Sequence, residues 1–245
     1  VFAVAAALFK RADYAWAARG RAPEIAWLLG PAGCDSFDAL TAAPPVQPPS
    51  RLFPDGGWAV MRGGWQRYAH QLLFDVGPLG CQMSGGHGHA DLLGIQCSPF
   101  GQGLLVDPGT YCYTAHANWR DHFRGTAAHN TVVVDRQNQA LPAGAFSWRR
   151  QRPRARLLEW RSSPAFDYAD AMHEAYRRLR DPVTHRRPVM FVKPHYWVLA
   201  DDLEGADVHT VDLMFQFGTA RLSEVKDGWI RAVAPGGNSL FIRSF

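Results

Sequence analysis

The stretch FDYADAMHEAYRRLRDPVTHRRPVMFVKPHYWVLADDL, residues 166–203, decides the fold. It holds two long runs rich in aromatic and β-branched residues, FDYADAMHEAY and VMFVKPHYWVLADDL, and apolar residues do not recur at helical spacing. Short runs of the same kind, separated by Gly and Pro turns, continue on both sides from Arg51 to Phe245. This spacing predicts a mainly β chain, an antiparallel β-sandwich. Pro194 has no N–H to donate, so we expect an edge or a bulge there.

The first 30 residues have a different pattern. Ala, Leu, Phe and Trp recur at three- and four-residue spacing, with Gly20 and Pro23 separating two helical segments. Four prolines between residues 44 and 49 then predict a stiff, extended connector. We therefore expect a helical part at residues 1–43 and a β domain at residues 44–245. The opening VFAVAAAL is too short for a membrane span and lacks the basic leader of a signal peptide.

Composition restricts the class of partner. The 245 residues are 47% hydrophobic and 20% charged, as in a globular protein, and four cysteines include no C-x-x-C pair. A net charge of +4 favours anionic partners, but no run of five or six like charges indicates nucleic acid. An acidic polymer of another kind fits at least as well. The 23 arginines against 3 lysines indicate either carboxylate or sulfate recognition or simply genomic base composition.

Candidate site residues gather between residues 84 and 135, which contain five of the ten histidines. His87 and His89 flank one glycine and would share a face if this segment is a strand. Asp107 follows the apolar run GLLV, and His129 lies just before the run TVVV, so each is expected at the mouth of a strand. Two histidines and one carboxylate, with a further position open, suit Zn²⁺.

Each of these residues has a plainer interpretation. The two histidines could be a structural pair, Asp107 could open a Pro-Gly turn, and His129 with Asn130 could only cap a strand. Asp91 could be a metal ligand or an acceptor that fixes an imidazole tautomer. The neighbouring glycines 85, 86 and 88 would let a ligand approach the backbone.

Tyrosines and cationic residues follow in the same stretch. Tyr113 could act as a general acid or base, whereas both it and Tyr111 could instead pack at an interface. A substrate carboxylate could be bound by cationic side chains nearby, or these could lie in a solvated loop: His116, Arg120, His122 and Arg124.

Several ordered motifs together resemble one family. GHGHAD (86–91), LLVDPGTYCY (104–113), WRDHFRGTAAHNTVVVD (119–135), HEAYRRL (173–179) and VTHRRPVMFVKPHYWVLADDLEG (183–205) look like those of the heparinase II/III-like polysaccharide lyases, relatives of alginate lyases. The resemblance implies an N-terminal (α/α) toroid followed by antiparallel β-sheet domains, with the active site between them. Residues 1–30 resemble the last helices of such a toroid, most of which this sequence does not include.

The resemblance also implies roles for individual residues. It makes His89, Asp107 and His129 zinc ligands and His87 an active-site histidine. Tyr113 resembles the tyrosine that alginate-type relatives use as acid or base. We expect Arg120, Arg124 and Asn130 to bind substrate.

The implied reaction is β-elimination from a uronic-acid-containing polysaccharide, a glycosaminoglycan or alginate. Neutralising the uronate carboxylate acidifies the C5 proton, and Tyr or His side chains then transfer protons while zinc organises the loop that carries His87. The implied location is periplasmic or secreted. We expect no membrane or nucleic-acid partner. The oligomeric state is left open, with a homodimer as one possibility. The alternatives are a non-catalytic carbohydrate-binding or structural β-domain, and a zinc hydrolase, for which no glutamate base lies nearby in sequence.

Overall fold

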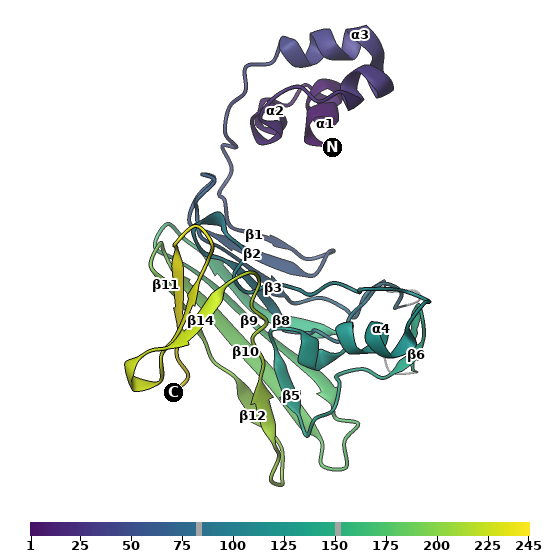
Figure 1. The fold of residues 1–245 in the computed structure, drawn as a ribbon, viewed down its shortest axis with the longest axis vertical. Coiled ribbons are helices and arrows are strands. Elements are labelled where there is room, and N and C mark those ends of the chain that lie inside the picture. Colours follow the sequence, from purple (N-terminus) through teal and green to yellow (C-terminus); the bar gives the residue numbers. More distant parts are fainter. Residues whose placement is uncertain (82–84, 150–152) are drawn as a thin grey trace. The chain divides into compact units, whose positions relative to one another are not determined.

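The computed structural model describes residues 1–81, 85–149 and 153–245 (Figure 1). The chain divides into two compact units, Val1–Pro49 and Ser50–Phe245. Within the described residues, none of the helices has the length and apolar character needed to cross a membrane.

The first unit consists of three helices, α1 (Phe2–Phe9), α2 (Ala12–Ala18) and α3 (Glu24–Asp38). They pack around small and apolar residues, including Ala6 and Ile25, neither of which is exposed. The prediction of two helical segments ending by residue 30 is wrong in its end point, because α3 bends at Gly30 and continues to Asp38. Gly30 takes a left-handed φ of 67°, and Pro31 then occupies the first turn of the second half, where its missing N–H costs nothing.

The second unit is built from antiparallel strands. A four-stranded sheet has the order β1–β2–β3–β4, with bounds Arg51–Phe53, Trp58–Arg62, Gln71–Asp75 and Ile95–Ser98. A five-stranded sheet has the order β11–β10–β9–β8, with β12 also on β10, and bounds Tyr196–Leu199, Val183–Val192, Phe166–Tyr176, Ala155–Ser162 and Asp202–Glu204. The decisive stretch at residues 166–203 thus forms β9 to β12.

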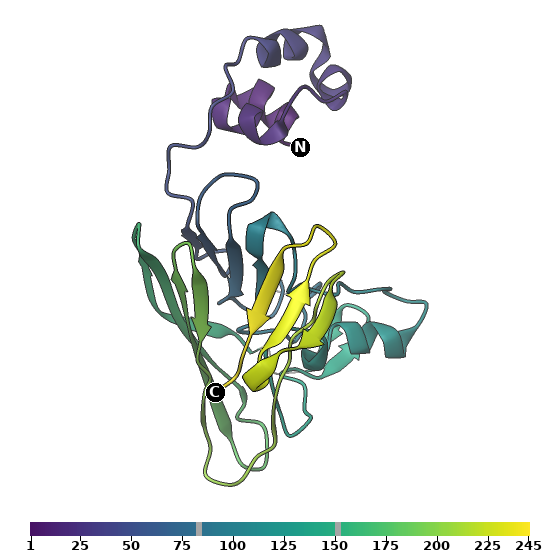
Figure 2. The ribbon, with the colours of Figure 1, turned by 60° about the vertical axis from the view of Figure 1, so that its left-hand side comes forward.

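Smaller sheets complete this unit. β5 (Val132–Val134) pairs with β13 (Val211–Leu213), and β6 (Pro142–Gly144) pairs with β7 (Ser147–Trp148). The last strands form the yellow sheet of Figure 2: β14 (Arg221–Glu224), β15 (Ile230–Val233) and β16 (Ser239–Ile242). Short 3₁₀ turns occur at η1 (Pro99–Gly101), η2 (Thr126–Ala128) and η3 (Lys226–Gly228).

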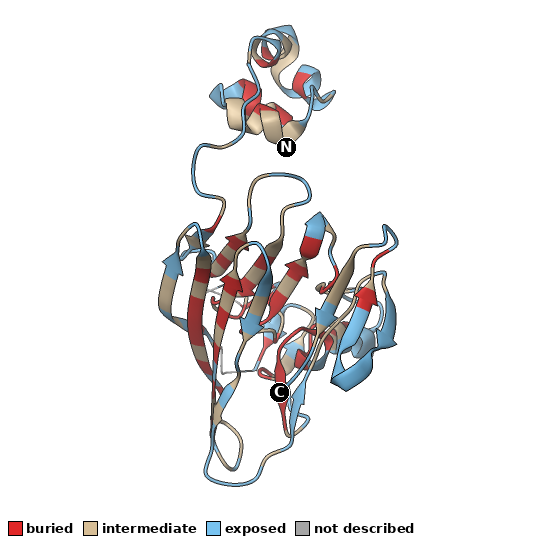
Figure 3. Ribbon diagram, turned by 90° about the vertical axis from the view of Figure 1, so that its left-hand side faces the viewer, coloured by how far each residue is buried: buried red, intermediate tan, exposed pale blue. Residues whose placement is uncertain are grey.

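The two large sheets share one hydrophobic core. Met61 and Phe74 from the four-stranded sheet and Ala171 and Phe191 from the five-stranded sheet belong to one buried cluster. Buried and partly exposed residues alternate along β2 and β3, as the strand period of two requires (Figure 3). Burying an aromatic side chain such as Phe74 stabilises the fold by about 1.5–3 kcal/mol. The predicted antiparallel, mainly β fold is confirmed.

Three local expectations are wrong. The run GLLVDPGT forms only a β-bridge at Leu105, to Cys97 on one side and Phe217 on the other. Strand-like runs without helices were expected from Arg51 onward, yet Ala117–Phe123 form a helix, α4, which is the one α-helix of this unit among its described residues. The expectation of an edge or a bulge at Pro194 is wrong as well, because Pro194 lies in the turn between β10 and β11, where neither strand has to accommodate it.

The connections on either side of β4 carry the candidate site. The chain between β3 and β4 holds His87, His89 and Asp91, and the chain between β4 and β5 holds Asp107 and His129. The chain after β4 folds back along it, because Leu105 forms an antiparallel bridge to Cys97, and Ile95 N donates to Asn130 O, so both connections lie beside the start of β4.

Candidate metal centre and adjoining cleft

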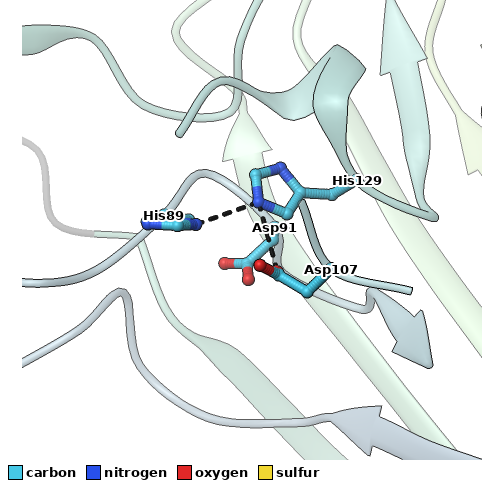
Figure 4. A group of neighbouring side chains, drawn as sticks. All are labelled: His89, Asp91, Asp107 and His129. Carbon is cyan, nitrogen blue, oxygen red and sulfur yellow. Dashed lines mark hydrogen bonds and ion pairs between the residues drawn. The ribbon is translucent and has the colours of Figure 1, made fainter. Parts of the chain in front are cut away.

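Four side chains converge beside β4. His89, Asp91, Asp107 and His129 each offer one ligand atom, and these atoms lie within 4.8 Å of one another (Figure 4). The sequence predicted three of them as ligands and left Asp91 as either a ligand or a neighbour. The structure places Asp91 within the same group.

Hydrogen bonds turn the donor atoms towards one another. His129 Nδ1 lies 2.7 Å from the carbonyl oxygen of Gly125, so Nδ1 carries the proton and Nε2 keeps its lone pair. That Nε2 lies 3.0 Å from His89 Nδ1 and 3.4 Å from Asp107 Oδ2. The other carboxylate oxygen, Asp107 Oδ1, accepts a hydrogen bond from Gly109 N at 2.7 Å.

His89 is oriented in the same manner. Its Nε2 lies 3.1 Å from Thr110 Oγ1, which accepts the Nε2 proton in the tautomer that leaves Nδ1 as a lone pair. Burial, followed by the effect of His129, lowers the pKa of His89 and favours the neutral imidazole. A neutral imidazole is the form that binds a metal.

The donor set fits a divalent transition metal. Two imidazole nitrogens and carboxylate oxygens in one compact group are ligands that Zn²⁺ accepts in a four-coordinate site. The partners at Gly125, Gly109 and Thr110 supply the outer hydrogen bonds that usually orient such ligands.

An open cleft of about 440 Å³ lies next to this group. Its lining includes His87, His89 and four aspartates, Asp55, Asp75, Asp91 and Asp107. Sequence reasoning missed Asp75, although it ends the apolar run QLLF of β3 just as Asp107 follows GLLV. Burial and then the negative charge of Asp91 raise the pKa of Asp75 well above its ordinary value, so this carboxyl retains its proton to higher pH.

His87, which lines the cleft, lies against Tyr113. Their ring centroids lie 5.9 Å apart, and Phe146 lies 5.8 Å from His87 and 5.2 Å from Tyr113. His87 is exposed, and Tyr113 and Phe146 are 45% and 48% exposed. Phe146 was not predicted, because the β6–β7 hairpin that carries it is remote in sequence from both partners.

The condition under which His87 and His89 would share a strand face is not met, because the described segment around them holds a turn and no strand. His87 has a left-handed φ of 61°. Gly88 is required by a close backbone approach, since a Cβ there would lie 2.6 Å from Gly80 N. Gly88 therefore serves a close contact within the β3–β4 connection, and both histidines line the cleft from this irregular segment.

The three residues expected to bind substrate have protein partners instead. Arg120 is 8% exposed and donates to Asp121 and to Tyr113 O, while Arg124 is 3% exposed and donates to Asp121 and to Gly144 O. The Arg124 contact ties α4 to β6. Because both guanidinium groups are buried against these acceptors, we assign them to holding the loops in place.

Asn130 also has an internal role. It is 2% exposed and donates through Nδ2 to Ile95 O at 2.8 Å and to Val106 O at 3.0 Å. Its Oδ1 accepts a hydrogen bond from Gln216 N at 2.5 Å. The side chain therefore joins the segment that precedes Asp107 to the one that follows His129, next to two of the candidate ligands.

The remaining candidates form a separate aromatic group. Tyr111 stacks on Phe123 at 5.5 Å and lies near Trp119 at 6.2 Å. His122 contacts Trp119 edge-on, and His116 occupies the N-cap position of α4 without a side-chain hydrogen bond to the helix. Tyr111 packs on these α4 rings while remaining 66% exposed, and its expected packing at an interface stays a prediction.

Comparison with known proteins identifies similar chains. The family model of the heparinase II/III-like C-terminal domain matches residues 45–243. A heparin-sulfate lyase of Bacteroides stercoris is 23% identical over 184 residues, which cover 73% of this chain and 24% of that protein. A heparin-sulfate lyase of Bacteroides thetaiotaomicron is 24% identical over 207 residues, covering 80% and 27%.

Solved structures show the same fold. The crystal structure of heparan sulfate lyase HepC from Pedobacter heparinus superposes with a TM-score of 0.71 at 19% identity, covering 99% of this chain and 33% of that chain. A heparinase III gene product with methylated lysines gives a TM-score of 0.69 at 23% identity, covering 86% and 30%. The chain thus spans about a quarter of the length of the curated relatives and about a third of these structures.

Proposed function

The chain belongs to the heparinase II/III-like family through its C-terminal domain, and from this membership we propose that it supplies the metal-supported part of a polysaccharide lyase active site. The proposed reaction is β-elimination from an acidic, uronate-containing polysaccharide. The named relatives are heparin-sulfate lyases, so a glycosaminoglycan of the heparan sulfate type is the first substrate to test.

One observation carries the proposal. His87 and Tyr113 meet beside the metal centre, with both rings accessible from solvent and 5.9 Å between their centroids. Imidazole and phenol are usable proton-transfer groups, and elimination requires two proton transfers. A pair of such groups at the rim of an open cleft can reach one sugar residue and its leaving oxygen.

In the proposed reaction the C5–H bond of the uronate breaks and its electrons form the C4–C5 double bond. The C4–O bond breaks at the same site, and the departing oxygen takes up a proton. One member of the His87–Tyr113 pair accepts the C5 proton and the other donates to the leaving oxygen. Phe146, which contacts both rings, holds them at this spacing.

The proposed metal is Zn²⁺, held by His89, Asp107 and His129 with Asp91 beside them. When bound, it would supply a fixed positive charge that anchors the ligand loops. His87 is two residues from His89, so fixing His89 also fixes the backbone that presents the His87 ring to the cleft. Thr110 and Gly125 orient the two ligand imidazoles for this purpose.

The test uses the protein expressed from its complete gene. We expect heparan sulfate to yield a 4,5-unsaturated uronate, detected by its ultraviolet absorbance, whereas a zinc hydrolase would yield saturated ends. His87→Ala and Tyr113→Phe should each lower kcat about 100-fold or more, because general acid–base groups typically contribute 10²–10⁴-fold. A higher KM with unchanged kcat would instead assign His87 to substrate binding.

One matched control and one panel complete the design. Tyr111→Phe alters a neighbouring tyrosine that packs on Phe123 and should leave kcat within a few-fold. Alginate and other uronate polymers, assayed beside heparan sulfate, separate the substrate classes. Unchanged elimination rates with both His87 and Tyr113 replaced would refute this site, and polysaccharide binding without elimination would favour a carbohydrate-binding domain.

A further inference from the structure

We propose that Arg187 is a positioning residue for the metal centre: its buried guanidinium holds together the two loops that carry His89, Asp91 and His129. The inference rests on the metal site proposed above. Arg187 lies on β10 and is 0% exposed. Its Nη1 donates to Leu93 O at 2.8 Å and to Asn130 O at 3.0 Å.

These two carbonyls belong to different ligand-bearing segments. Leu93 is two residues after Asp91, and Asn130 directly follows His129. One nitrogen of Arg187 therefore spans the gap between the loop before β4 and the loop after it. Asn130 extends the connection to the third ligand, because its Nδ2 donates to Val106 O just before Asp107.

The loop that Arg187 contacts is held in a costly conformation. Leu93 has a left-handed φ of 58°, which non-glycine residues adopt only when their surroundings impose it. Gln139 Oε1 accepts a hydrogen bond from Leu92 N, and Gln139 Nε2 donates one to Leu92 O. Thr131 Oγ1 donates to the same carbonyl oxygen. Arg187 is the charged member of this set of buried contacts.

The guanidinium of Arg187 is itself held in place by Asp201. Asp201 accepts from Nε at 2.6 Å through Oδ1 and from Nη2 at 3.0 Å through Oδ2, a two-pronged contact that sets the plane of the guanidinium. Burial raises the pKa of Asp201, but the hydrogen bond from His185 and the charge of Arg187 outweigh it and hold that pKa at about 2. Asp201 is thus ionised at neutral pH and can pair with the guanidinium of Arg187.

Two neutral histidines complete the support. Burial lowers the pKa of both His173 and His185. Ala175 N donates to His173 Nδ1, so the proton of His173 is on Nε2, which lies 3.2 Å from His185 Nδ1. His185 Nε2 then donates to Asp201 Oδ1 at 2.7 Å. The chain of donors runs from the five-stranded sheet to Asp201 and leaves Arg187 one orientation.

A neighbouring arginine provides a matched control. Arg186 is next on the same strand and also makes a two-pronged contact, with Asp170, but its side chain is 47% exposed. It has no contact with either ligand loop among the described hydrogen bonds and ion pairs. The variants Arg187→Lys and Arg186→Lys therefore make the same chemical change on opposite faces of β10.

The readout is metal affinity, which a purely stabilising residue would not alter in the folded protein. Zinc affinity is measured by competition with a chromogenic chelator, and the geometry of the site by the visible spectrum of bound Co²⁺, well below the melting temperature of each variant. Lysine can pair with Asp201, but its single ammonium cannot reproduce the planar fork. We expect Arg187→Lys to weaken zinc binding about 10–100-fold and to shift the Co²⁺ spectrum, the usual effect of losing an outer partner. Arg186→Lys should stay within about threefold.

The outcomes distinguish a failure of the Arg187 inference from a failure of the proposed metal site. If the wild-type protein binds no zinc, the metal site is wrong. If the wild type binds zinc and folded Arg187→Lys binds it equally well, Arg187 only stabilises the fold and the inference is overturned. Should Arg187→Lys fail to fold, Asp201→Asn keeps the volume and Arg187 while releasing the guanidinium. It should weaken zinc binding about tenfold, and unchanged affinity would equally overturn the inference.

Discussion

Replacing Asn130 by Ala should destabilise the β unit strongly, even without metal. The side chain makes three hydrogen bonds, to Ile95 O, Val106 O and Gln216 N, and is 2% exposed. Alanine removes all three and leaves three main-chain groups without their partner. A buried polar group left unsatisfied costs about 1–3 kcal/mol. Allowing for relaxation and entry of water, we expect a loss of about 3–5 kcal/mol.

This loss in the free energy of unfolding is large relative to the total stability of a domain. Domains typically unfold with about 5–15 kcal/mol, and for a unit of this size 1 kcal/mol corresponds to roughly 2–4 °C. The melting temperature of Asn130→Ala should therefore fall by roughly 10 °C. Urea unfolding with chelator present gives the free energy directly and removes any contribution from metal.

The control is Asn118→Ala, an exposed position on α4. Alanine is the better helix former, so this variant should stay within about 0.5 kcal/mol of the wild type. A loss below about 1 kcal/mol for Asn130→Ala would refute the view that this side chain joins the ligand segments. The interpretation would then return to a residue available to substrate.

Three further outcomes are expected. His129→Ala should abolish stoichiometric zinc binding, and its melting temperature should no longer respond to a chelator, because metal bound only by the native state stabilises that state; a chelator response like that of the wild type would place the metal elsewhere. Phe74→Ala, at a fully buried core position, should cost about 3–5 kcal/mol in urea unfolding, and a cost near zero would contradict the shared core of the two sheets. Hydrogen bonds to Asp135 and Asp181 raise the pKa of His209 and lower the pKa of both carboxyls. The stabilisation that these contacts of His209 give the fold should therefore be full between about pH 3.9 and 6.5, the ordinary pKa values of Asp and His. It should be lost as pH rises through the raised pKa of His209 or falls through the lowered pKa values of the two carboxyls. Melting of His209→Gln should lie furthest below the wild type near pH 5.5 and approach it near pH 8.5; a constant difference would exclude titration of His209 as the cause.

Local patterns predicted the elements whose cause is local. Alternation along β2 and β3 follows from the two-residue strand period, and the position of His129 before β5 follows from the apolar run after it. α4 was missed because its seven residues are too few to establish helical periodicity, and its tertiary contacts, such as Arg124 with Gly144, lie outside it. The same limitation applied to Leu105, whose bridges to Cys97 and Phe217 are contacts between distant segments.

By itself the sequence determined the antiparallel β class and the cluster of histidines and aspartates from which the metal centre is proposed, because residue type and spacing limit both. Only the tertiary structure decided which polar side chains support that site and which line its cleft. Arg187 meets Leu93 across 94 residues, and Asn130 meets Gln216 across 86. Nothing in the sequence near Arg187 separates it from Arg186, yet one guanidinium is buried behind the ligands and the other faces solvent. Alternation along β10 places the two on opposite faces, but which face is covered depends on how the sheets and loops pack, and that is a property of the whole fold.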